Sequence, residues 1–445
     1  MTGDGARRLE VSGNGAGGRS ALVLLGAGAL ILCAFAAMVW LQSKPGEPAF
    51  MAALAAAGIG YLIALTRLVR RPCLSRRALA LCLALAFAGR AVLLTLPDDQ
   101  GGDSIRYVWD ARAQRAGLNP YTARPDDSAL AWLHTDLTRR VHAPWLPTIY
   151  PPVAQLYFRV VTSLDESVFA FRVAAVICDM LITLAIAAAL AATGRPLAWV
   201  LVYAWHPLVP VEAAAGAHVD LLGVLMLVVS WLALIQKRTT VAAIAFVAAV
   251  LVKLLPIVLL PLYWRRVRVR DALLAAALAG AAVLAVTGGQ PPIGSLGAFV
   301  DRFRFNGPIF AALNYVVDAR VAATGAVVIG LVVAAWLRVR RSVQEPDAWA
   351  WPMAGALLAA PVVCPWYLVW LTPFLSSRRS LPVLVWSLSV LAVYPVWYMR
   401  SLGGSWIVPA PLLGLEFGAV AVAAAALIGR RSLQERPART PALRP

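Results

Sequence analysis

The sequence predicts an all-α polytopic membrane protein, and three observations support this. Of its 445 residues, 61% are hydrophobic and 14% are charged, whereas soluble proteins average roughly 45–50% apolar and about 25% charged residues. The mean hydropathy is +0.74. The apolar residues form runs near the ~20 residues that a helix needs to cross a bilayer, and short basic loops separate these runs, as the positive-inside rule describes. We expect about ten full transmembrane helices and two broken or re-entrant segments in a single domain of residues 21–428, with cytoplasmic tails at residues 1–20, which we expect to be disordered, and 429–445.

Composition and motifs exclude several classes of function. A net charge of +18 would suggest a nucleic-acid partner in a soluble protein, but the loop positions of the basic residues explain it here, so we expect no nucleic acid. The five cysteines show no metal-ligand spacing and no disulfide framework. There is no phosphate-binding P-loop, no GxGxxG before a helix and no HExxH. We therefore expect no cofactor, and a group donor would arrive through the membrane.

The first half of the chain predicts an alternating topology. Arginines between the second and third predicted spans place that loop in the cytoplasm and the next segment, residues 97–152, outside. This external segment holds seven acids and six arginines, so it lacks the basic excess of an inner loop. An amphipathic helix is expected at residues 153–164, directly after this segment. The predicted spans are residues 21–41, 50–68, 78–96, 168–192, 199–214 and 219–235.

Two later segments are long enough for one span but have basic residues on both sides. A single crossing would place one basic flank outside, against the positive-inside rule. Residues 240–264 have basic residues on both sides, and Lys253 and Pro256 interrupt the middle. A pair of half-helices that returns to the cytoplasm, with Lys253 near the inner tip, resolves the conflict, provided that it packs within protein or lines a cavity. Residues 349–374 repeat the pattern with three prolines. The remaining predicted spans are residues 272–287, 319–337, 381–398 and 411–428, with an external loop at 288–318.

The external stretch GGDSIRYVWDARAQRAGLNPY, residues 101–121, carries the first candidate for chemistry. Helical spacing predicts a short amphipathic helix over residues 104–116, with Ile105 and Trp109 on its apolar face, lying in the membrane interface. Gly117 is a suitable stop. Asp103 then either caps this helix, as Asp does well, or acts as a general base at the membrane surface.

Ionisable residues in or beside spans are costly, so each one is a functional candidate. Arg172 lies near the outer end of its span with Asp179 two turns deeper, which suits either function or a buried ion pair. Glu212, His218 and Asp220 form an external turn that could bind a metal ion, bind sugar hydroxyls or serve only as a turn.

Three more residues have two interpretations each. Lys253 could pair with a phosphate or extend its amine to the membrane interface. Trp366 and Tyr367 could belong to an interfacial aromatic belt, or stack on a sugar ring or a prenyl chain.

Several motifs resemble the GT-C type glycosyltransferases, and more narrowly the polyprenyl-phosphate-mannose-dependent mannosyltransferases of glycosyltransferase family 87. The external segment carries D-x-x-R-Y-x-W-D from Asp103, followed by G-L-N-P-Y and I-Y-P-P. The resemblance covers most of residues 78–374. Its later motifs are F-R-x(6)-D from Phe171, W-H-P-L from Trp205, E-x(5)-H-x-D from Glu212, V-K-L-L-P from Val252 and C-P-W-Y-L-V-W from Cys364.

The resemblance implies a GT-C-like bundle and an inverting transfer of a sugar, mannose being favoured, from a polyprenyl-phosphate donor to a lipid or glycan acceptor. It implies that Asp103 is the general base, that Arg172 and Lys253 hold the donor phosphate, and that Glu212, His218 and Asp220 lie in the sugar or acceptor cleft. We assign no metal ligand. The other residues expected to bind substrate are Arg106, Tyr107, Asp110, Tyr150, Asn306, Trp366 and Tyr367.

The same resemblance implies a multi-pass protein of the cytoplasmic membrane, surrounded by membrane lipids, with its active site outside and both termini in the cytoplasm. A transporter or flippase of lipid-linked sugars is the alternative, because broken helices suit transport, although the two halves of the chain show no repeat. A third possibility is a non-catalytic assembly partner, in which Asp103 would be dispensable.

Overall fold

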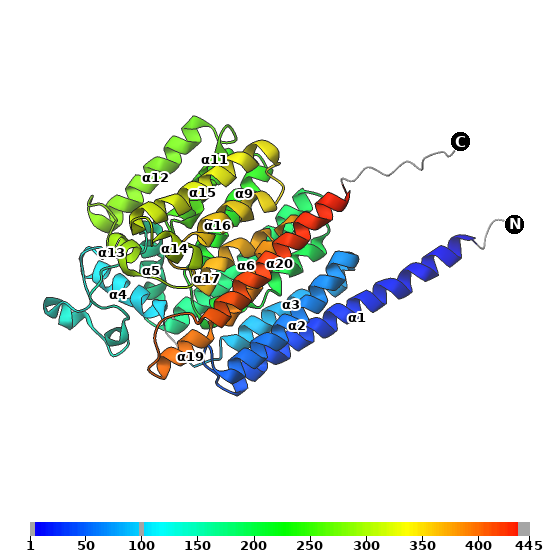
Figure 1. Ribbon diagram of the computed structural model, residues 1–445, viewed down its shortest axis with the longest axis horizontal. Coiled ribbons are helices and arrows are strands. Elements are labelled where there is room, and N and C mark those ends of the chain that lie inside the picture. The colour runs from blue at the N-terminus through cyan, green and yellow to red at the C-terminus, as the bar shows by residue number, and fades with distance from the viewer. Residues whose placement is uncertain (1–4, 98–101, 435–445) are drawn as a thin grey trace.

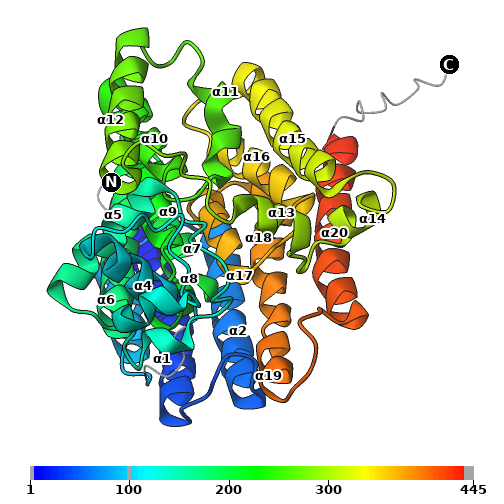
Figure 2. The same cartoon turned by 90° about the vertical axis from the view of Figure 1, so that its left-hand side faces the viewer.

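The computed structural model describes residues 5–97 and 102–434, and this part of the chain forms one bundle of helices (Figures 1 and 2). In Figure 1 the N-terminal end of α1 (Gly5–Trp40) and the C-terminal end of α20 (Ala410–Gln434) point to one side. The helices α4 (Asp103–Arg115) and α5 (Pro152–Leu164) lie at the opposite side. The long connection between α4 and α5 contains only the short 3₁₀ helices Ser128–Leu133 and Thr138–Arg140. The helix α1 extends back to Gly5, into the segment expected to be a disordered tail.

Within the described residues, seven helices are long and apolar enough to cross a membrane, or eight if one bent pair counts as a single span. The predicted count of about ten is therefore not confirmed. Most of the seven agree closely with the predicted spans. They are Ala21–Trp40 of α1, α2 (Pro48–Arg70), α6 (Val168–Ala192), α12 (Val269–Thr287), α15 (Ala319–Arg340), Arg378–Ser401, which contains α18 (Leu381–Ser389) and α19 (Pro395–Ser401), and Ala410–Gly429 of α20.

Three predicted spans differ from these seven. The helix α3 (Arg76–Leu93) is present but holds three arginines in 18 residues, and α9 (Asp220–Ile235) has only 16 residues. The segment predicted as one span over residues 199–214 is instead the bent pair Leu197–Ala204 and Leu208–Ala215, with an angle of 54°. The predicted span is therefore present but bent, and it counts as one span if the pair crosses the membrane together. Pro207 lies within the break, and proline cannot continue the backbone hydrogen bonding of a helix interior.

The first predicted broken segment forms a hairpin. The helix α10 (Thr239–Val250) ends before Lys253, and the chain returns through the 3₁₀ helix Leu255–Leu259 and α11 (Leu260–Tyr263). The hydroxyls of Thr239 and Thr240 donate to the carboxylate of Asp271 at 2.6 and 2.8 Å. Both ends of the segment therefore lie together, with the break between them.

The second broken segment also returns on itself. The helix α16 (Asp347–Leu358) is followed by α17 (Pro365–Leu368) and the 3₁₀ helix Val369–Phe374. The indole of Trp351 donates to the carbonyl of Arg379 at 3.2 Å, and Arg379 pairs with Glu345 at 2.8 Å. We name the two units hairpin 1 (residues 239–271) and hairpin 2 (residues 345–379).

The basic loops at the ends of these hairpins and after α15 meet at one end of the bundle. Arg266 donates to the carbonyl of Arg341 at 3.2 Å, and Arg338 donates to the carbonyl of Trp264 at 3.0 Å. Arg195, from the loop after α6, donates to the hydroxyl of Ser376 near the end of hairpin 2. Helix α9 separates this basic end from Asp220 by about 24 Å, at 1.5 Å per residue.

The interior of the bundle holds a buried ion pair that differs from the expected one. Asp179 of α6 pairs with Arg90 of α3 at 2.7 Å, and both side chains are buried. Arg90 also donates to the carbonyl of Ala204 at 2.7 Å. The suggested pair of Asp179 with Arg172 is therefore wrong, and the actual pair joins α3, α6 and the bent helix.

The helix α4 packs against the protein on both its apolar and its polar face. Ile105 and Trp109 are buried, as predicted, but Asp110 on the opposite face is equally buried. The side chain of Gln155 on α5 donates to Asp110 at 2.9 Å. Polar partners on α5 thus cover part of the polar face of α4, and its position in the membrane interface stays a prediction. Two further helices, α13 (Leu296–Arg302) and α14 (Pro308–Leu313), follow α12.

Candidate active site

The bent segment ends in a π-helix, Val211–Ala215, and a tight turn that together present Glu212 and His218. The backbone N–H of His218 donates to the carbonyl of Glu212 at 3.1 Å. Gly216 allows the two side chains to meet, because a Cβ there would lie 2.5 Å from the His218 ring and 2.9 Å from a Glu212 oxygen. Ala217 has φ = 55°, a left-handed conformation that costs energy in a residue with a side chain.

Glu212 and His218 form a buried, oriented pair. His218 Nε2 lies 3.1 Å from Glu212 Oε2, and Tyr394 donates its hydroxyl to Glu212 Oε1. The imidazole stacks on the indole of Trp366, with centroids 4.1 Å apart and planes inclined by 15°. His218 Nδ1 is buried and has no hydrogen-bond partner.

Asp103 faces this free nitrogen from another element. It is the first residue of α4, and Gly102 rather than Asp103 occupies the cap position. Its carboxylate Oδ2 lies 4.0 Å from His218 Nδ1, and its side chain is 40% exposed. Asp103 is thus the accessible carboxylate of a site whose other acids are buried.

The second acid–cation pair lies at the tips of the two hairpins. Asp220 Oδ1 accepts from Lys253 Nζ of hairpin 1 at 2.7 Å and from Trp370 Nε1 of hairpin 2 at 2.6 Å. The Lys253 ammonium also lies 3.7 Å from the centroid of the Tyr367 ring. This is an ion pair with a cation–π contact, and the lysine does not extend to an interface as the alternative interpretation required.

The His218–Glu212 pair and the Lys253–Asp220 pair have the same kinds of groups. Each has a buried carboxylate, a cationic or ionisable nitrogen and an aromatic ring from the adjacent residues Trp366 and Tyr367. Hairpin 2 therefore holds both nitrogens against neighbouring rings. The tips of the hairpins and the turn after the π-helix converge on one small volume beside Asp103.

The surrounding carboxylates determine the charge state of His218. Burial alone would lower the pKa of this imidazole, but Glu212 first, and then Asp103 and Asp220, raise the pKa above its ordinary value. The imidazolium is thereby favoured. An exposed carboxylate beside a cationic nitrogen can bind a hydroxyl and take its proton, and the Lys253 ammonium can bind an anion.

Tyr107 and Tyr150 pack next to the turn that carries His218. The Tyr107 hydroxyl accepts from the backbone N–H of Val219 at 3.4 Å, and its ring stacks on Phe158 at 4.2 Å. Tyr150 contacts the edge of Tyr107 with centroids 5.1 Å apart. Burial raises the pKa of both phenols well above the ordinary value, so they support the turn as neutral groups.

Two predicted site residues on α4, Arg106 and Asp110, have their hydrogen-bond partners away from His218. Arg106 donates to the carbonyls of His142, Ala143 and Leu146, which fixes that loop. Asp110 faces α5, where burial raises its pKa to about 6 although Arg106 opposes the shift. The structure does not bring these two side chains into contact with the residues around His218.

Arg172 and Asn306 also have structural partners. The buried guanidinium of Arg172 donates to the carbonyls of Leu93 and Leu96 and to that of Ala214 in the π-helix. It thus links the chain before Asp103 to the turn that carries His218. Asn306 donates to the buried Glu416 of α20 at 3.0 Å and to the carbonyl of Val363 at 3.2 Å.

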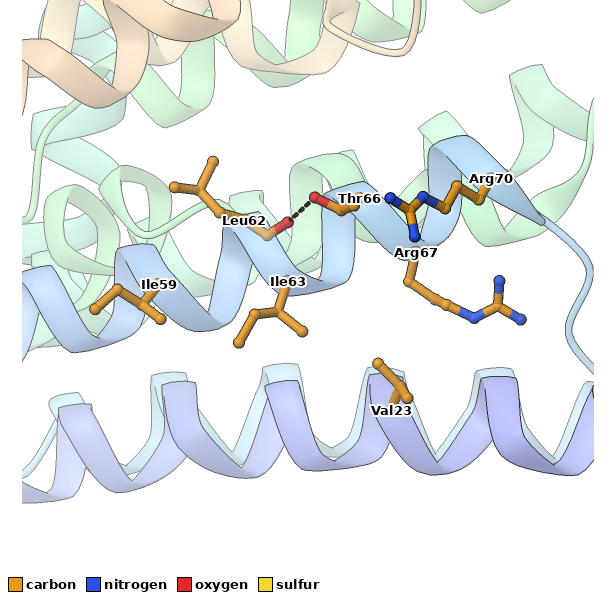
Figure 3. A pocket seen from close by; sticks show the side chains of 7 residues that line it. All are labelled: Val23, Ile59, Leu62, Ile63, Thr66, Arg67 and Arg70. Atoms are coloured by element: carbon orange, nitrogen blue, oxygen red, sulfur yellow. Dashed lines mark hydrogen bonds between the residues drawn. The ribbon is translucent and has the colours of Figure 1, made fainter.

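Among the residues that the structure describes, no group of three or more His, Cys, Asp or Glu side chains is arranged to hold a metal ion. A separate groove lies between α1 and α2, and none of the candidate site residues lines it (Figure 3). Its lining is mostly apolar, with Arg67 and Arg70 at one end. Such a surface suits lipid contact, and it contains none of the acids described above.

Sequence reasoning missed two residues of the site, Trp370 and Tyr394. Trp370 closes the motif C-P-W-Y-L-V-W, so the pattern that singled out Trp366 and Tyr367 could have included it. Tyr394 lies in an apolar run without a motif, and only its contact with Glu212 places it here.

Comparison with known families identifies the family to which the chain belongs. The family model "Alpha-(1->6)-mannopyranosyltransferase, N-terminal domain" matches residues 16–267, which are 252 of the 445 residues. The chain belongs to this family. It is a membrane mannosyltransferase, as the motifs predicted at that level, and the match gives no support to a transporter. Membership of glycosyltransferase family 87 stays a prediction.

The matched region includes Asp103, Glu212, His218, Asp220 and Lys253, and it ends before hairpin 2 and Tyr394. No curated protein and no solved structure matches the chain.

Proposed function

We propose that this protein transfers a mannosyl residue from a polyprenyl-phosphate donor to a hydroxyl of a lipid or glycan acceptor at the outer face of the cytoplasmic membrane, as a GT-C type enzyme. The convergence of Asp103, the His218–Glu212 pair and the Lys253–Asp220 pair carries this proposal. It combines an accessible base with an anion-binding cation in a protein that lies in a bilayer. A lipid-linked donor can reach such a site without a nucleotide.

The name of the family suggests the linkage. An α-(1→6) product requires an acceptor sugar that offers the primary hydroxyl at its C6, and we take mannose as that sugar. A single displacement inverts the anomeric carbon, so an α product requires a β-linked mannosyl phosphate as donor. We assign both specificities to this chain.

The residues have separate roles in the proposed reaction. The Asp103 carboxylate takes the proton of the acceptor hydroxyl while the oxygen attacks C1 of mannose. The bond from C1 to the phosphate oxygen breaks, and its electron pair leaves on the polyprenyl phosphate. Lys253 stabilises the charge that develops there. A positioned base contributes typically 10²- to 10⁴-fold in rate.

Arg172 was expected to hold the phosphate together with Lys253. Its contacts with the backbone on both sides of the site favour a different role, the positioning of the chain that leads to Asp103. The donor phosphate is therefore assigned to Lys253, whose side chain is 20% exposed, rather than to the fully buried Arg172.

The direct test uses the purified full-length chain in lipid nanodiscs with octyl α-mannopyranoside as acceptor. Polyprenyl phosphates carrying β-mannose, glucose or arabinose are supplied in turn, and loss of donor and gain of product are measured by mass spectrometry. We expect transfer from the mannosyl donor and an α-(1→6)-linked product. Consumption of none of the donors, or movement of intact donor across proteoliposomes, would overturn the proposal.

A further inference from the structure

Within the part of the chain that the structure describes, His218 Nδ1 is a buried nitrogen of the candidate site that has no hydrogen-bond partner. Its residue is only 7% exposed. Leaving a buried polar atom unpaired costs about 1–3 kcal/mol. The nitrogen is directed toward Asp103, whose carboxylate is too far away for a direct hydrogen bond at 4.0 Å.

The gap between these two atoms matches a single oxygen atom. An oxygen placed about 2.8 Å from each, a normal hydrogen-bond length, forms a triangle whose base is the 4.0 Å separation. The angle at that oxygen is then about 90°, which is compatible with two hydrogen bonds to one hydroxyl. The exposed side of Asp103 gives a ligand access to this position.

We propose that His218 and Asp103 together form the acceptor-hydroxyl subsite, in which the attacking oxygen lies between His218 Nδ1 and Asp103 Oδ2. This inference rests on the proposed function and assigns to His218 a role in binding the acceptor rather than the donor. The imidazolium donates its Nδ1–H to one lone pair of the hydroxyl oxygen. The hydroxyl donates its own hydrogen to Asp103, and a second lone pair remains to attack the sugar.

The environment of His218 fixes it for this role. Glu212 accepts from Nε2, Tyr394 holds Glu212, and Trp366 covers one face of the ring. The charged groups that influence His218 are Glu212, Asp103 and Asp220, and Asp220 is already paired with Lys253. Rotation of the imidazole is restricted, so the direction of Nδ1 is determined before the acceptor binds.

Protons and electrons balance in this arrangement. The proton of the acceptor hydroxyl moves to Asp103, the oxygen forms the bond to C1, and the phosphate departs with the electron pair of the broken bond. His218 keeps both of its protons throughout. It holds and polarises the hydroxyl, and no further co-reactant is required.

The test compares His218→Gln with His218→Asn. The amide nitrogen of glutamine can occupy the place of Nε2 and keep the bond to Glu212, whereas that of asparagine can occupy the place of Nδ1. With β-mannosyl polyprenyl phosphate and octyl α-mannopyranoside, we expect His218→Gln to raise the acceptor KM about tenfold or more, the usual effect of losing a hydrogen bond to a charged group. The donor KM should stay within about twofold, and His218→Asn should recover part of the loss.

An acceptor analogue isolates the hydroxyl itself. Octyl 6-deoxy-α-mannopyranoside lacks the oxygen that the subsite binds, so the wild type should bind it at least about tenfold more weakly than octyl α-mannopyranoside. In His218→Gln this preference should shrink severalfold. Both affinities are measured by calorimetry on the donor-free protein, without turnover, so the result does not depend on whether Asp103 proves to be the base.

The experiments distinguish a failure of the proposed function from a failure of the acceptor subsite. Retained activity in Asp103→Asn overturns the proposed base but leaves the calorimetric comparison informative about His218. An unchanged preference for the 6-hydroxyl in His218→Gln, or a rise in donor KM instead of acceptor KM, overturns the subsite. His142→Gln is the matched control, because His142 is an exposed histidine of the same external segment, and it should match the wild type.

Discussion

Lys253 and Asp220 form an ion pair of 2.7 Å between the tip of hairpin 1 and the start of α9. The pair is mostly buried, and Trp370 donates to the same carboxylate oxygen. A phosphate that binds Lys253 would have to share the ammonium with Asp220. The lysine is thus held in place by a carboxylate and an aromatic ring before any donor arrives.

Replacing this lysine should weaken donor binding specifically. We expect Lys253→Met to raise the donor KM at least about tenfold, because a charge-assisted bond to phosphate is lost, while the acceptor KM changes little. Initial rates at varied donor concentration measure the effect. Since Lys253→Met also leaves Asp220 without its cation, Lys253→Met/Asp220→Asn serves as a control for folding. A donor KM that stays at the wild-type value in both variants would contradict the assignment.

Asp103→Asn should abolish transfer without unfolding the protein. The structure gives this side chain no capping bond to lose, and asparagine cannot accept the proton, so a rate loss of about 10²- to 10⁴-fold is expected. Turnover and thermal unfolding are measured on the same preparation. Asp136→Asn, which alters an exposed acid of the same segment, should behave like the wild type. Turnover within tenfold of the wild type in Asp103→Asn would exclude the catalytic role.

The pH profile should report the charge of His218. The carboxylates around it raise its pKa above the ordinary value, so the protonated form persists as pH rises past about 6.5. If the imidazolium holds the acceptor, kcat/KM for the acceptor falls as pH rises through this raised pKa. The alkaline decline should disappear in His218→Gln, measured over pH 6–9. The same decline in that variant would assign it to another group.

Asp110 should make the stability of the external segment depend on pH. Burial raises the pKa of Asp110 to about 6, above the unfolded value of about 3.9. A raised carboxyl pKa contributes stability that is present below the unfolded pKa and is lost as pH rises through the folded one. We therefore expect Asp110→Asn, which mimics the neutral acid, to have a higher Tm than the wild type at pH 8 and a similar Tm at pH 4. Equal Tm differences at both values would refute this account.

The hairpins predict which side of the membrane each loop faces. Thr239 and Asp271 are hydrogen-bonded, so both ends of hairpin 1 should be cytoplasmic. A cysteine introduced at Arg270 in a background without native cysteines should react with a membrane-impermeant maleimide only after the membrane is opened. A cysteine at Trp145, which is exposed in the external segment, should react in intact cells. Labelling of position 270 from outside would reject the proposed topology.

The apolar runs identified most of the long helices correctly because burial in a bilayer requires length and apolar composition, and both can be counted in a sequence. The two broken segments were also correctly anticipated, since prolines and a lysine interrupt them between basic flanks. The bent helix before Glu212 was missed. Its apolar composition equals that of a straight span, and its break depends on how Pro207 and the π-helix pack.

The structure brings together several residues that the sequence singled out, and their roles stay predictions. Asp103, Glu212, His218, Asp220 and Lys253 were each singled out as ionisable residues in or beside apolar runs. Their pairing could not be predicted, and neither could the diversion of Asp110 to Gln155 or of Asp179 to Arg90. A charged residue in an apolar environment must find a partner, but the sequence does not say which partner lies within reach.

The sequence by itself determined that this is a helical membrane protein, where most of its long apolar helices lie, and which polar residues need an explanation. Only the tertiary structure decided that the turn at His218, the tips of both hairpins and the start of α4 meet in one place. Composition and periodicity report the environment of each segment separately, because they arise from local burial and helix geometry. The distances between a nitrogen of His218, Asp103 and Glu212 depend on the packing of segments far apart in the chain, and that packing sets which group can hold a proton and which can bind an anion.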